Sequence, residues 1–339
     1  TGGGNADGTV AIGKSALNAL TTGSSNVAIG YQSSAALTTG ANNVSLGYNA
    51  LFRATTQTDN CVAIGESALS SNHTTADVND IVAIGKSVME GTLTAAASGS
   101  VGIGKDALRN LTSGEGNTAV GYQAGETITD GQYNTLLGTE AGLTLDGGTS
   151  NVFVGWKAGR LQDEAGHCIG IGHLALANST NDTSHNNIAI GSNSLDAVAD
   201  GVATDNVAIG FDALTDLTIG DHNTVVGSSA GANTTEGIRN VVAGHQAFFT
   251  NITGSYCVAI GRSALYTSDA NVNTAVGYEA LYANSSGTKN TAVGAYAMDS
   301  VTGGYNNSAL GYNAGAALTG DHSVLIGADA GVTTTQLTS

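Results

Sequence analysis

The chain has 339 residues, with 49 glycines, no proline, only 11% charged residues and a formal net charge of −17 at pH 7. Nucleic acids and anionic membrane surfaces are bound by clusters of basic side chains, and the ten Lys and Arg residues are too few to form them. No apolar run approaches the roughly 20 residues of a membrane-spanning helix, so neither nucleic acid binding nor membrane insertion is expected. No charged-then-apolar leader opens the sequence, and because it starts at Thr1 we expect a processed or excised piece of a longer protein.

The first motif along the chain is GTVAIGKS at Gly8–Ser15, which matches the phosphate-loop pattern G-x-x-x-x-G-K-[ST]. A phosphate loop follows a buried strand, but the preceding segment TGGGNAD has no strand character. The loop interior, Thr9 to Ile12, is β-prone and favours an extended backbone over a curled nest of amides. The match therefore predicts no nucleotide, and no other cofactor motif occurs.

A repeat explains this motif. Segments of the type NVAIG recur along the whole sequence and always end in glycine. Successive closing glycines are 17 residues apart in eleven of eighteen intervals and 16 to 20 residues apart in the others. A short strand repeated at this interval without a long helix predicts an all-β parallel solenoid or β-roll of about 19 coils, forming one repeat array over residues 1–339. The nineteen closing glycines are Gly13, Gly30, Gly47, Gly65, Gly85, Gly104, Gly121, Gly138, Gly155, Gly172, Gly191, Gly210, Gly227, Gly244, Gly261, Gly277, Gly294, Gly311 and Gly327.

Each repeat reads as a strand, a bend and a turn. Positions are counted from the closing glycine, so that position −1 is the residue directly before it. Ala or Ser at position +3, followed by Leu or Gly at +4 and often an aliphatic residue at +7, suits one helical turn or a tight bend. Many repeats have glycine at position −7, as at Gly23, Gly220 and Gly304, where we expect a turn with positive φ.

The strand residues predict two faces. Position −1 is aliphatic in every repeat, so we expect positions −1 and −3 to face the core of the coil. Position −2 would then face outward, yet its only polar residue is Ser45. An outer strand face without polar residues predicts a covering surface, most simply a second copy, and small residues allow close approach about a threefold axis. The alternative is that the coil covers both faces itself. The alanines expected at this homotrimer interface are Ala28, Ala63, Ala119, Ala189, Ala208, Ala259, Ala275 and Ala292.

Position −4 is Asn in twelve of the nineteen repeats, and stacked Asn side chains can hydrogen-bond along a ladder. Cys61, Cys168 and Cys257 occupy the same position. They lie at least five coils apart, too far for a disulfide within one chain. We therefore expect buried thiols, with bridges between chains near a symmetry axis as the alternative.

Position +1 is chemically variable, which indicates an exposed edge. Aromatic side chains there would be able to stack against sugar rings, although scattered exposed apolar residues are also normal. The candidate glycan contacts are Tyr31, Tyr48, Tyr122, Trp156, Phe211, Tyr278 and Tyr312.

Catalytic and metal motifs are missing from the sequence. The histidines and cysteines share no metal-ligand spacing, and the Gly-Gly-x-Gly-x-Asp nonapeptide of calcium solenoids does not occur. Acids such as Asp163 and Glu164 would serve glycoside hydrolysis only if folding placed two carboxylates at the required separation. Solvated loop acids are the simpler interpretation, so we expect no enzyme and no cofactor or metal.

The segment NTAVGYQAG at 117–125, together with NVAIGYQS, NTAVGYEAL and NSALGYNAG, resembles repeats of bacteriophage tail fibres, especially those preceding self-cleaving chaperone domains. These segments are also similar to the SVAIGxxA head repeats of trimeric autotransporter adhesins, whose coils are shorter. The resemblance implies a trimeric, left-handed β-roll on a virion or an extracellular cell surface, which carries or forms a surface that binds a host glycan or protein receptor. The alternatives are a bacterial adhesin head, an ice-binding solenoid, which would require Thr-x-Thr strand ladders, and a glycan-cleaving tailspike.

Overall fold

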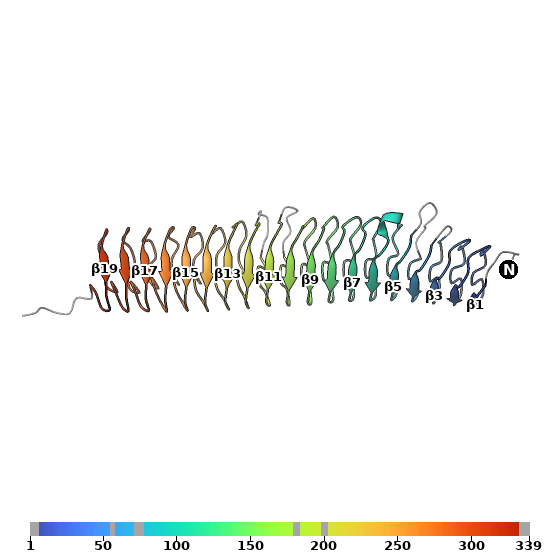
Figure 1. The fold of residues 1–339 in the computed structure, drawn as a ribbon, viewed down its shortest axis with the longest axis horizontal. Coiled ribbons are helices and arrows are strands. Elements are labelled where there is room, and N and C mark those ends of the chain that lie inside the picture. Colours follow the sequence, from blue (N-terminus) through green and yellow to red (C-terminus); the bar gives the residue numbers. More distant parts are fainter. Residues whose placement is uncertain (1–6, 55–57, 71–77, 179–183, 198–202, 332–339) are drawn as a thin grey trace, which may run out of the picture. The chain divides into compact units, whose positions relative to one another are not determined.

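The computed structural model describes residues 7–54, 58–70, 78–178, 184–197 and 203–331. The chain forms two compact units, Thr1–Gly170 and Ile171–Ser339. Each unit is a parallel β-solenoid in which a three-residue strand recurs once per coil (Figure 1). The predicted fold class is thereby confirmed, with about 17 to 19 coils in the chain.

The strands follow the predicted repeat. The first unit contains β1 (Val10–Ile12), β2 (Val27–Ile29), β3 (Val44–Leu46), β4 (Val62–Ile64), β5 (Val82–Ile84), β6 (Val101–Ile103), β7 (Thr118–Val120), β8 (Thr135–Leu137) and β9 (Val152–Val154). The boundary between the units falls within β10 (Ile169–Ile171). The second unit continues with β11 (Ile188–Ile190), β12 (Val207–Ile209), β13 (Thr224–Val226), β14 (Val241–Ala243), β15 (Val258–Ile260), β16 (Thr274–Val276), β17 (Thr291–Val293), β18 (Ser308–Leu310) and β19 (Val324–Ile326).

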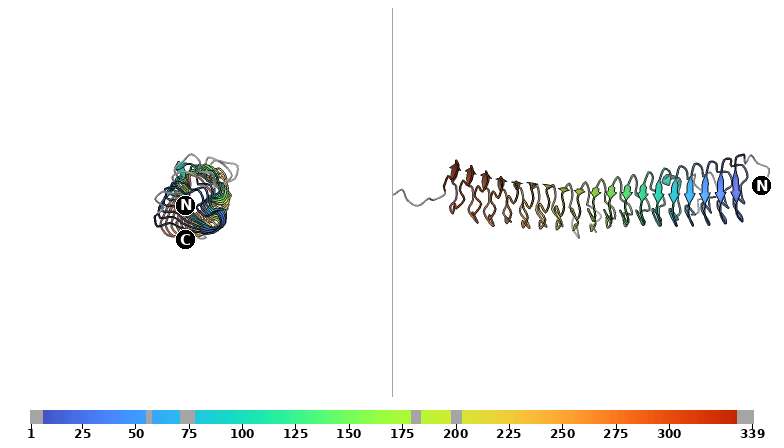
Figure 2. Two further views of the ribbon diagram at one scale, coloured as in Figure 1. Left: turned by 90° about the vertical axis from the view of Figure 1, so that its right-hand side faces the viewer. Right: turned by 90° about the horizontal axis from the view of Figure 1, so that it is seen from below.

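Within each unit the strands of successive coils pair in parallel with equivalent residues opposite one another (Figure 2). Ala11 pairs with Ala28 in the first unit, and Val225 pairs with Val242 in the second. The segment after each strand is a run of turns. Among the described residues the only helix is the short 3-10 helix η1 (Ala95–Ala97), so the bend that the sequence predicts contains almost no helix.

The two strand faces are reversed relative to the prediction. Position −2 points into the coil, and Ala28 there has none of its surface exposed, whereas Leu137 and Leu310 at position −1 are 48% and 51% exposed. The interface assignment was therefore wrong, because these alanines pack inside their own coil and are closed to a second chain. The alanines concerned are Ala28, Ala63, Ala119, Ala189, Ala208, Ala259, Ala275 and Ala292.

The narrow interior of the coil explains this arrangement. Buried side chains at positions +4 and +7, such as Leu214 and Leu217, fill the space behind the strand. A small residue at position −2, such as Ala208, fits against them. Interiors of proteins are close-packed, so the larger aliphatic residues at positions −1 and −3 have no room inside and face outward.

The closing glycines are required for two reasons. Gly121 has φ 147°, and a side chain there would overlap the carbonyl oxygen of Gly138 in the next coil.

At position −7 the expectation of positive φ was wrong for Gly23 and Gly220, whose φ lies outside this region. A side chain at Gly220 would instead overlap the next coil, so close stacking is the reason for glycine there, and only Gly304 of the three has positive φ, at 94°.

Candidate binding surfaces

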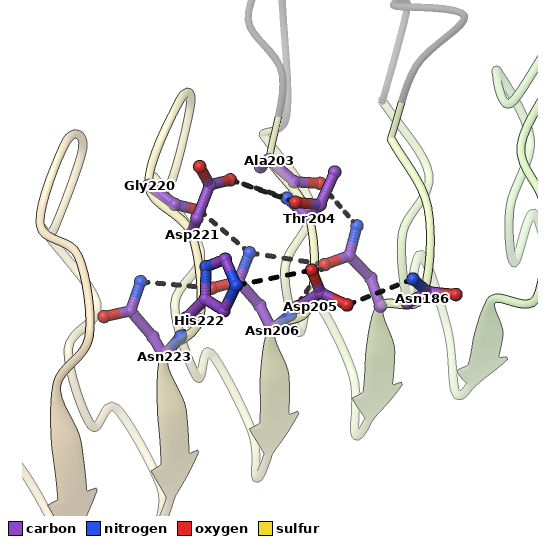
Figure 3. Close-up of polar contacts among 10 residues, drawn as sticks. Asn186, Ala203, Thr204, Asp205, Asn206, Gly220, Asp221, His222 and Asn223 are labelled. Atoms are coloured by element: carbon purple, nitrogen blue, oxygen red, sulfur yellow. Dashed lines mark hydrogen bonds and ion pairs between the residues drawn. The ribbon is translucent and has the colours of Figure 1, made fainter.

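The asparagines at position −4 form a buried ladder within each unit. In the first unit, Nδ2 of Asn134 donates to the carbonyl oxygen of Gly148 at 2.7 Å, and its Oδ1 accepts from the backbone N–H of Asn151 at 3.0 Å. In the second unit, Asn206 donates to the carbonyl oxygen of Gly220 at 2.8 Å (Figure 3). The predicted ladder is confirmed. Because it satisfies backbone groups of each turn, it is a structural element and leaves little polarity free for a ligand.

The three cysteines replace asparagines in this ladder, as predicted. Cys61, Cys168 and Cys257 are all buried. The backbone N–H of Cys61 donates to Oδ1 of Asn43, and that of Cys257 to Oδ1 of Asn240, both at 2.9 Å. Burial raises the pKa of the Cys61 thiol to about 12 and that of Cys257 to about 11. Both thiols are therefore protonated at neutral pH, which makes them poor nucleophiles.

Figure 3 also shows an outer row of side chains at position −5, next to the ladder. Nδ2 of Asn186 donates to Oδ1 of Asp205 at 3.0 Å, and Nε2 of His222 lies 3.6 Å from Oδ2 of the same carboxylate. Asp221 beside them accepts from the backbone N–H of Thr204 at 2.8 Å. This row connects neighbouring coils. Among the described residues no three His, Cys, Asp or Glu side chains are placed to hold a metal ion.

The aromatic residues at position +1 lie on an exposed edge, as predicted. Tyr31 and Tyr48 stack with ring centroids 5.4 Å apart, and Lys157 lies over the ring of Trp156 at 4.2 Å. Six of the seven candidate glycan contacts are exposed, and Tyr278 is half-buried. Contact with sugars stays a prediction. The exposed residues are Tyr31, Tyr48, Tyr122, Trp156, Phe211 and Tyr312.

The outer face of the strands is a second exposed surface, which we call the aliphatic face. It consists of the side chains at position −1, which are all aliphatic, and at position −3, which are Val or Ile in thirteen strands and Thr or Ser in six. These side chains are half-buried or exposed in every strand. None of the nineteen strands contains a charged residue. Sequence reasoning missed this surface because it placed the same residues inside the coil.

An open groove lies between positions +2 and +5 of successive coils. In the second unit it has a volume of about 320 Å³ and is lined by Asp212, Thr215, Asp216, Ser229, Ala232, Asn233, Gln246 and Phe249. A groove of about 320 Å³ occupies the equivalent place in the first unit and is lined by Asn49, Phe52, Arg53, Ser67, Ser70, Glu90 and Thr92. Sequence reasoning missed both grooves, although aromatic residues at position +5 in several coils were a usable signal.

Comparisons with known proteins give no family for this chain. A scan against models of protein families finds no match, and a search of curated proteins finds no similar sequence. Within the described residues, no helix has the length and apolar character needed to cross a membrane.

Proposed function

We propose that the chain is a structural, non-enzymatic repeat region of an attachment fibre on a virion or a cell surface, and that it works as a homo-oligomer. The observation that carries this proposal is the aliphatic face. The face has an unbroken row of aliphatic side chains at position −1 and mainly Val at position −3, with no charge from coil to coil. Such a surface is unusual on a monomeric protein, where large apolar patches mark interaction sites. The interface predicted at position −2 is thus replaced by one at positions −1 and −3.

A second copy of the chain fits this face better than another partner. The net charge of −17 makes two copies repel each other wherever their charged surfaces meet, and the strands contribute nothing to that charge. Stacked strands repeat about every 4.8 Å, so a second copy presents side chains with the same spacing, coil for coil. Fully burying an exposed Leu, Ile or Val contributes about 1.5–3 kcal/mol, and side chains such as Leu137 and Leu310, which are about half exposed, contribute the corresponding part of that. Three copies are expected from the trimeric families that the repeats resemble.

The attachment role follows from what the oligomer leaves uncovered. The edge at position +1 and the grooves at positions +2 and +5 belong to the turns that follow the strands, so we expect them to stay accessible when copies associate through the strands. Their side chains differ from coil to coil, as expected of a surface that recognises a receptor on a scaffold of uniform ladders. A bacterial adhesin head is the alternative within the same class, and an image of the particle or cell that bears the protein would distinguish the two.

Light scattering and sedimentation equilibrium of the full chain test this proposal. We expect a trimer, and a monomer in a variant carrying Leu137→Glu, Val226→Glu and Leu310→Glu, because burying these carboxylates in the interface is unfavourable. The matched control is a variant with Tyr48→Glu, Phe211→Glu and Tyr312→Glu, which adds the same charge on the edge at position +1 and should stay trimeric. A folded monomer of the unmodified chain would overturn the proposal.

A further inference from the structure

The groove of the second unit is built around the end of an aromatic stack. Phe249, Tyr266 and Tyr282 occupy position +5 in three successive coils. The ring centroids of Phe249 and Tyr266 are 5.3 Å apart with 21° between the ring planes, and those of Tyr266 and Tyr282 are 5.0 Å apart with 17°. The stack ends at Phe249 because the residue at position +5 of the preceding coil is Ala232. Since Ala232 and Phe249 both line the groove, the groove lies where a further ring would continue the stack.

Polar side chains surround this place. Thr215 and Ser229 provide hydroxyls, Asn233 and Gln246 provide amides, and all four are half-buried. Such groups donate and accept hydrogen bonds with a ligand that carries many hydroxyls. An apolar ring face next to hydroxyl and amide groups is the pattern that recognises a pyranose, which has a flat hydrocarbon face and a polar rim.

The charge of the groove lining favours neutral sugars over anionic ones. The carboxylates of Asp212 and Asp216 line the groove, and no Lys or Arg does. One of them is already engaged, because Oδ1 of Asp212 accepts from Nδ2 of Asn193 at 3.0 Å. Asp216 is exposed at the rim, where its carboxylate can accept hydrogen bonds from sugar hydroxyls. A sulfated, sialylated or uronic acid chain would be repelled here, whereas a neutral chain would not.

The equivalent groove of the first unit differs in its chemistry. Phe52 occupies position +5 there, but the guanidinium of Arg53 lies over its ring at 5.9 Å. Arg53 and Glu90 bring charges of both signs to that lining. The ring face that is available at Phe249 is therefore shared with a cation at Phe52, which restricts the inference to the second unit and makes Phe52 a natural control.

We propose that the groove of the second unit binds a neutral oligosaccharide, with one pyranose ring stacked on Phe249 as the next member of the aromatic stack. Asn233, Gln246 and Asp216 hydrogen-bond the ring hydroxyls. The hydroxyl of Thr215, which already donates to the carbonyl oxygen of Asn193 at 3.2 Å, accepts from them. This inference rests on the proposed attachment function and names the receptor class and the site.

The test uses the full chain on an array of neutral, sulfated and sialylated oligosaccharides, followed by calorimetry with the best neutral ligand. We expect neutral chains to bind, and Phe249→Ala to weaken binding at least tenfold while Phe52→Ala leaves it unchanged. Phe211→Ala in the same unit tests the competing possibility that the exposed edge at position +1 holds the sugar. If Phe249→Ala fails to fold, Asn233→Ala replaces it, with a weakening of severalfold expected from the lost amide.

Other outcomes would overturn the inference. These are binding of anionic chains only, loss of binding in Phe211→Ala but not in Phe249→Ala, and no binding of any neutral chain. If no neutral chain binds but light scattering shows a trimer, the sugar site is refuted and the proposed structural role is still supported. If a neutral chain binds at Phe249 but the protein is monomeric, the proposed oligomer is refuted and the sugar site is still supported.

Discussion

The ring of Phe153 fills the space that a side chain at Gly159 would need. Gly159 has φ 59°, and a Cβ atom on it would overlap Cδ2, Cε2 and Cγ of Phe153. The two residues are positions −2 and +4 of the same coil. In the coil that contains Ala189, position +4 is instead Leu195, which has φ 49° and is buried. One large and one small residue therefore share the interior of these coils.

This size relationship predicts a rescue. Phe153→Ala should destabilise the protein by about 3–5 kcal/mol, as is usual for a buried Phe that leaves a cavity. Adding Gly159→Leu should recover most of that loss, because the pair then matches Ala189 and Leu195. The free energy of unfolding of the two single variants and the double variant, measured in urea, gives the coupling between the sites. Additive losses in the double variant would show that the two positions do not share one space.

The closing glycines should be far less replaceable than glycines in open turns. Gly121→Ala places a side chain at φ 147° against the carbonyl oxygen of Gly138. We expect a loss well above the ~1–2 kcal/mol that positive φ alone costs a residue with a Cβ. Gly99→Ala is the matched control, since Gly99 has φ 76° but no heavy atom within 4 Å of the added Cβ. Equal losses of stability in urea would mean that stacking of the coils contributes nothing to the requirement.

Extending the asparagine ladder should stabilise the second unit. Sγ of Cys257 lies 3.3 Å from the carbonyl oxygen of Ala270, a weak interaction in the place where Asn makes a strong one. In Cys257→Asn the new Nδ2 would donate to Ala270, and the new Oδ1 would accept from the next coil, as Asn240 does for Cys257. We expect a gain of about 1 kcal/mol in unfolding free energy. Cys257→Ala, which removes the thiol without adding an amide, should show no gain, and a loss in Cys257→Asn would contradict the prediction.

Stability should decline at alkaline pH because of the buried thiols. In the unfolded chain the pKa of a thiol is close to 9.0, whereas burial raises the pKa of Cys61 to about 12 and that of Cys257 to about 11. Between these values the unfolded state binds fewer protons, so the unfolding free energy falls as pH rises, by up to about 1.4 kcal/mol per pH unit for each thiol. The contribution is fully present below pH 9.

Urea midpoints between pH 8 and pH 11 measure this decline, and a variant with Cys61→Ser and Cys257→Ser provides the comparison. Tyr and Lys titrate in the same range in both proteins, so the difference between the two curves reports the thiols. A difference that does not change with pH would contradict the prediction.

Much of the fold was predictable because it depends on the spacing of the sequence repeat. The regular spacing of closing glycines such as Gly121 and Gly138 gives the coil length, and strands without intervening helices leave stacking in parallel as the only arrangement. The asparagine ladder was predictable for the same reason, since equivalent residues of successive coils lie over one another. The cysteines followed from their position in that ladder.

The orientation of the strands was predicted wrongly, because it depends on side-chain volume rather than on the period of the repeat. Alternation places Ala208 and Ile209 on opposite faces but does not say which face is inside. The larger residue was assigned to the core, without counting the space that Leu214 and Leu217 already fill. Where position −2 is large, as at Phe153, position +4 is small, as at Gly159. This relation is visible in the sequence and indicates that position −2 shares the interior of the coil with position +4.

The candidate site was predicted only in part. Exposure of the edge at position +1 follows from its chemical variety, and the structure confirms it for residues such as Tyr48 and Phe211. The groove was not predictable from one repeat, because positions +2 and +5 of three successive coils form it together. Its character depends on the absence of a large side chain at Ala232 beside Phe249, which is a relation between two coils.

The corner of the coil that holds η1 has a practical consequence. The interval that contains Ala95–Ala97 is longer than the usual 17 residues, yet Val82 and Val101 on either side pair in the same register as other strands. Extra residues at this corner are therefore absorbed without any change in how the coils stack. The corner is a natural graft point, where foreign peptides of several residues can be displayed at chosen multiples of the coil repeat on a scaffold that keeps its own geometry.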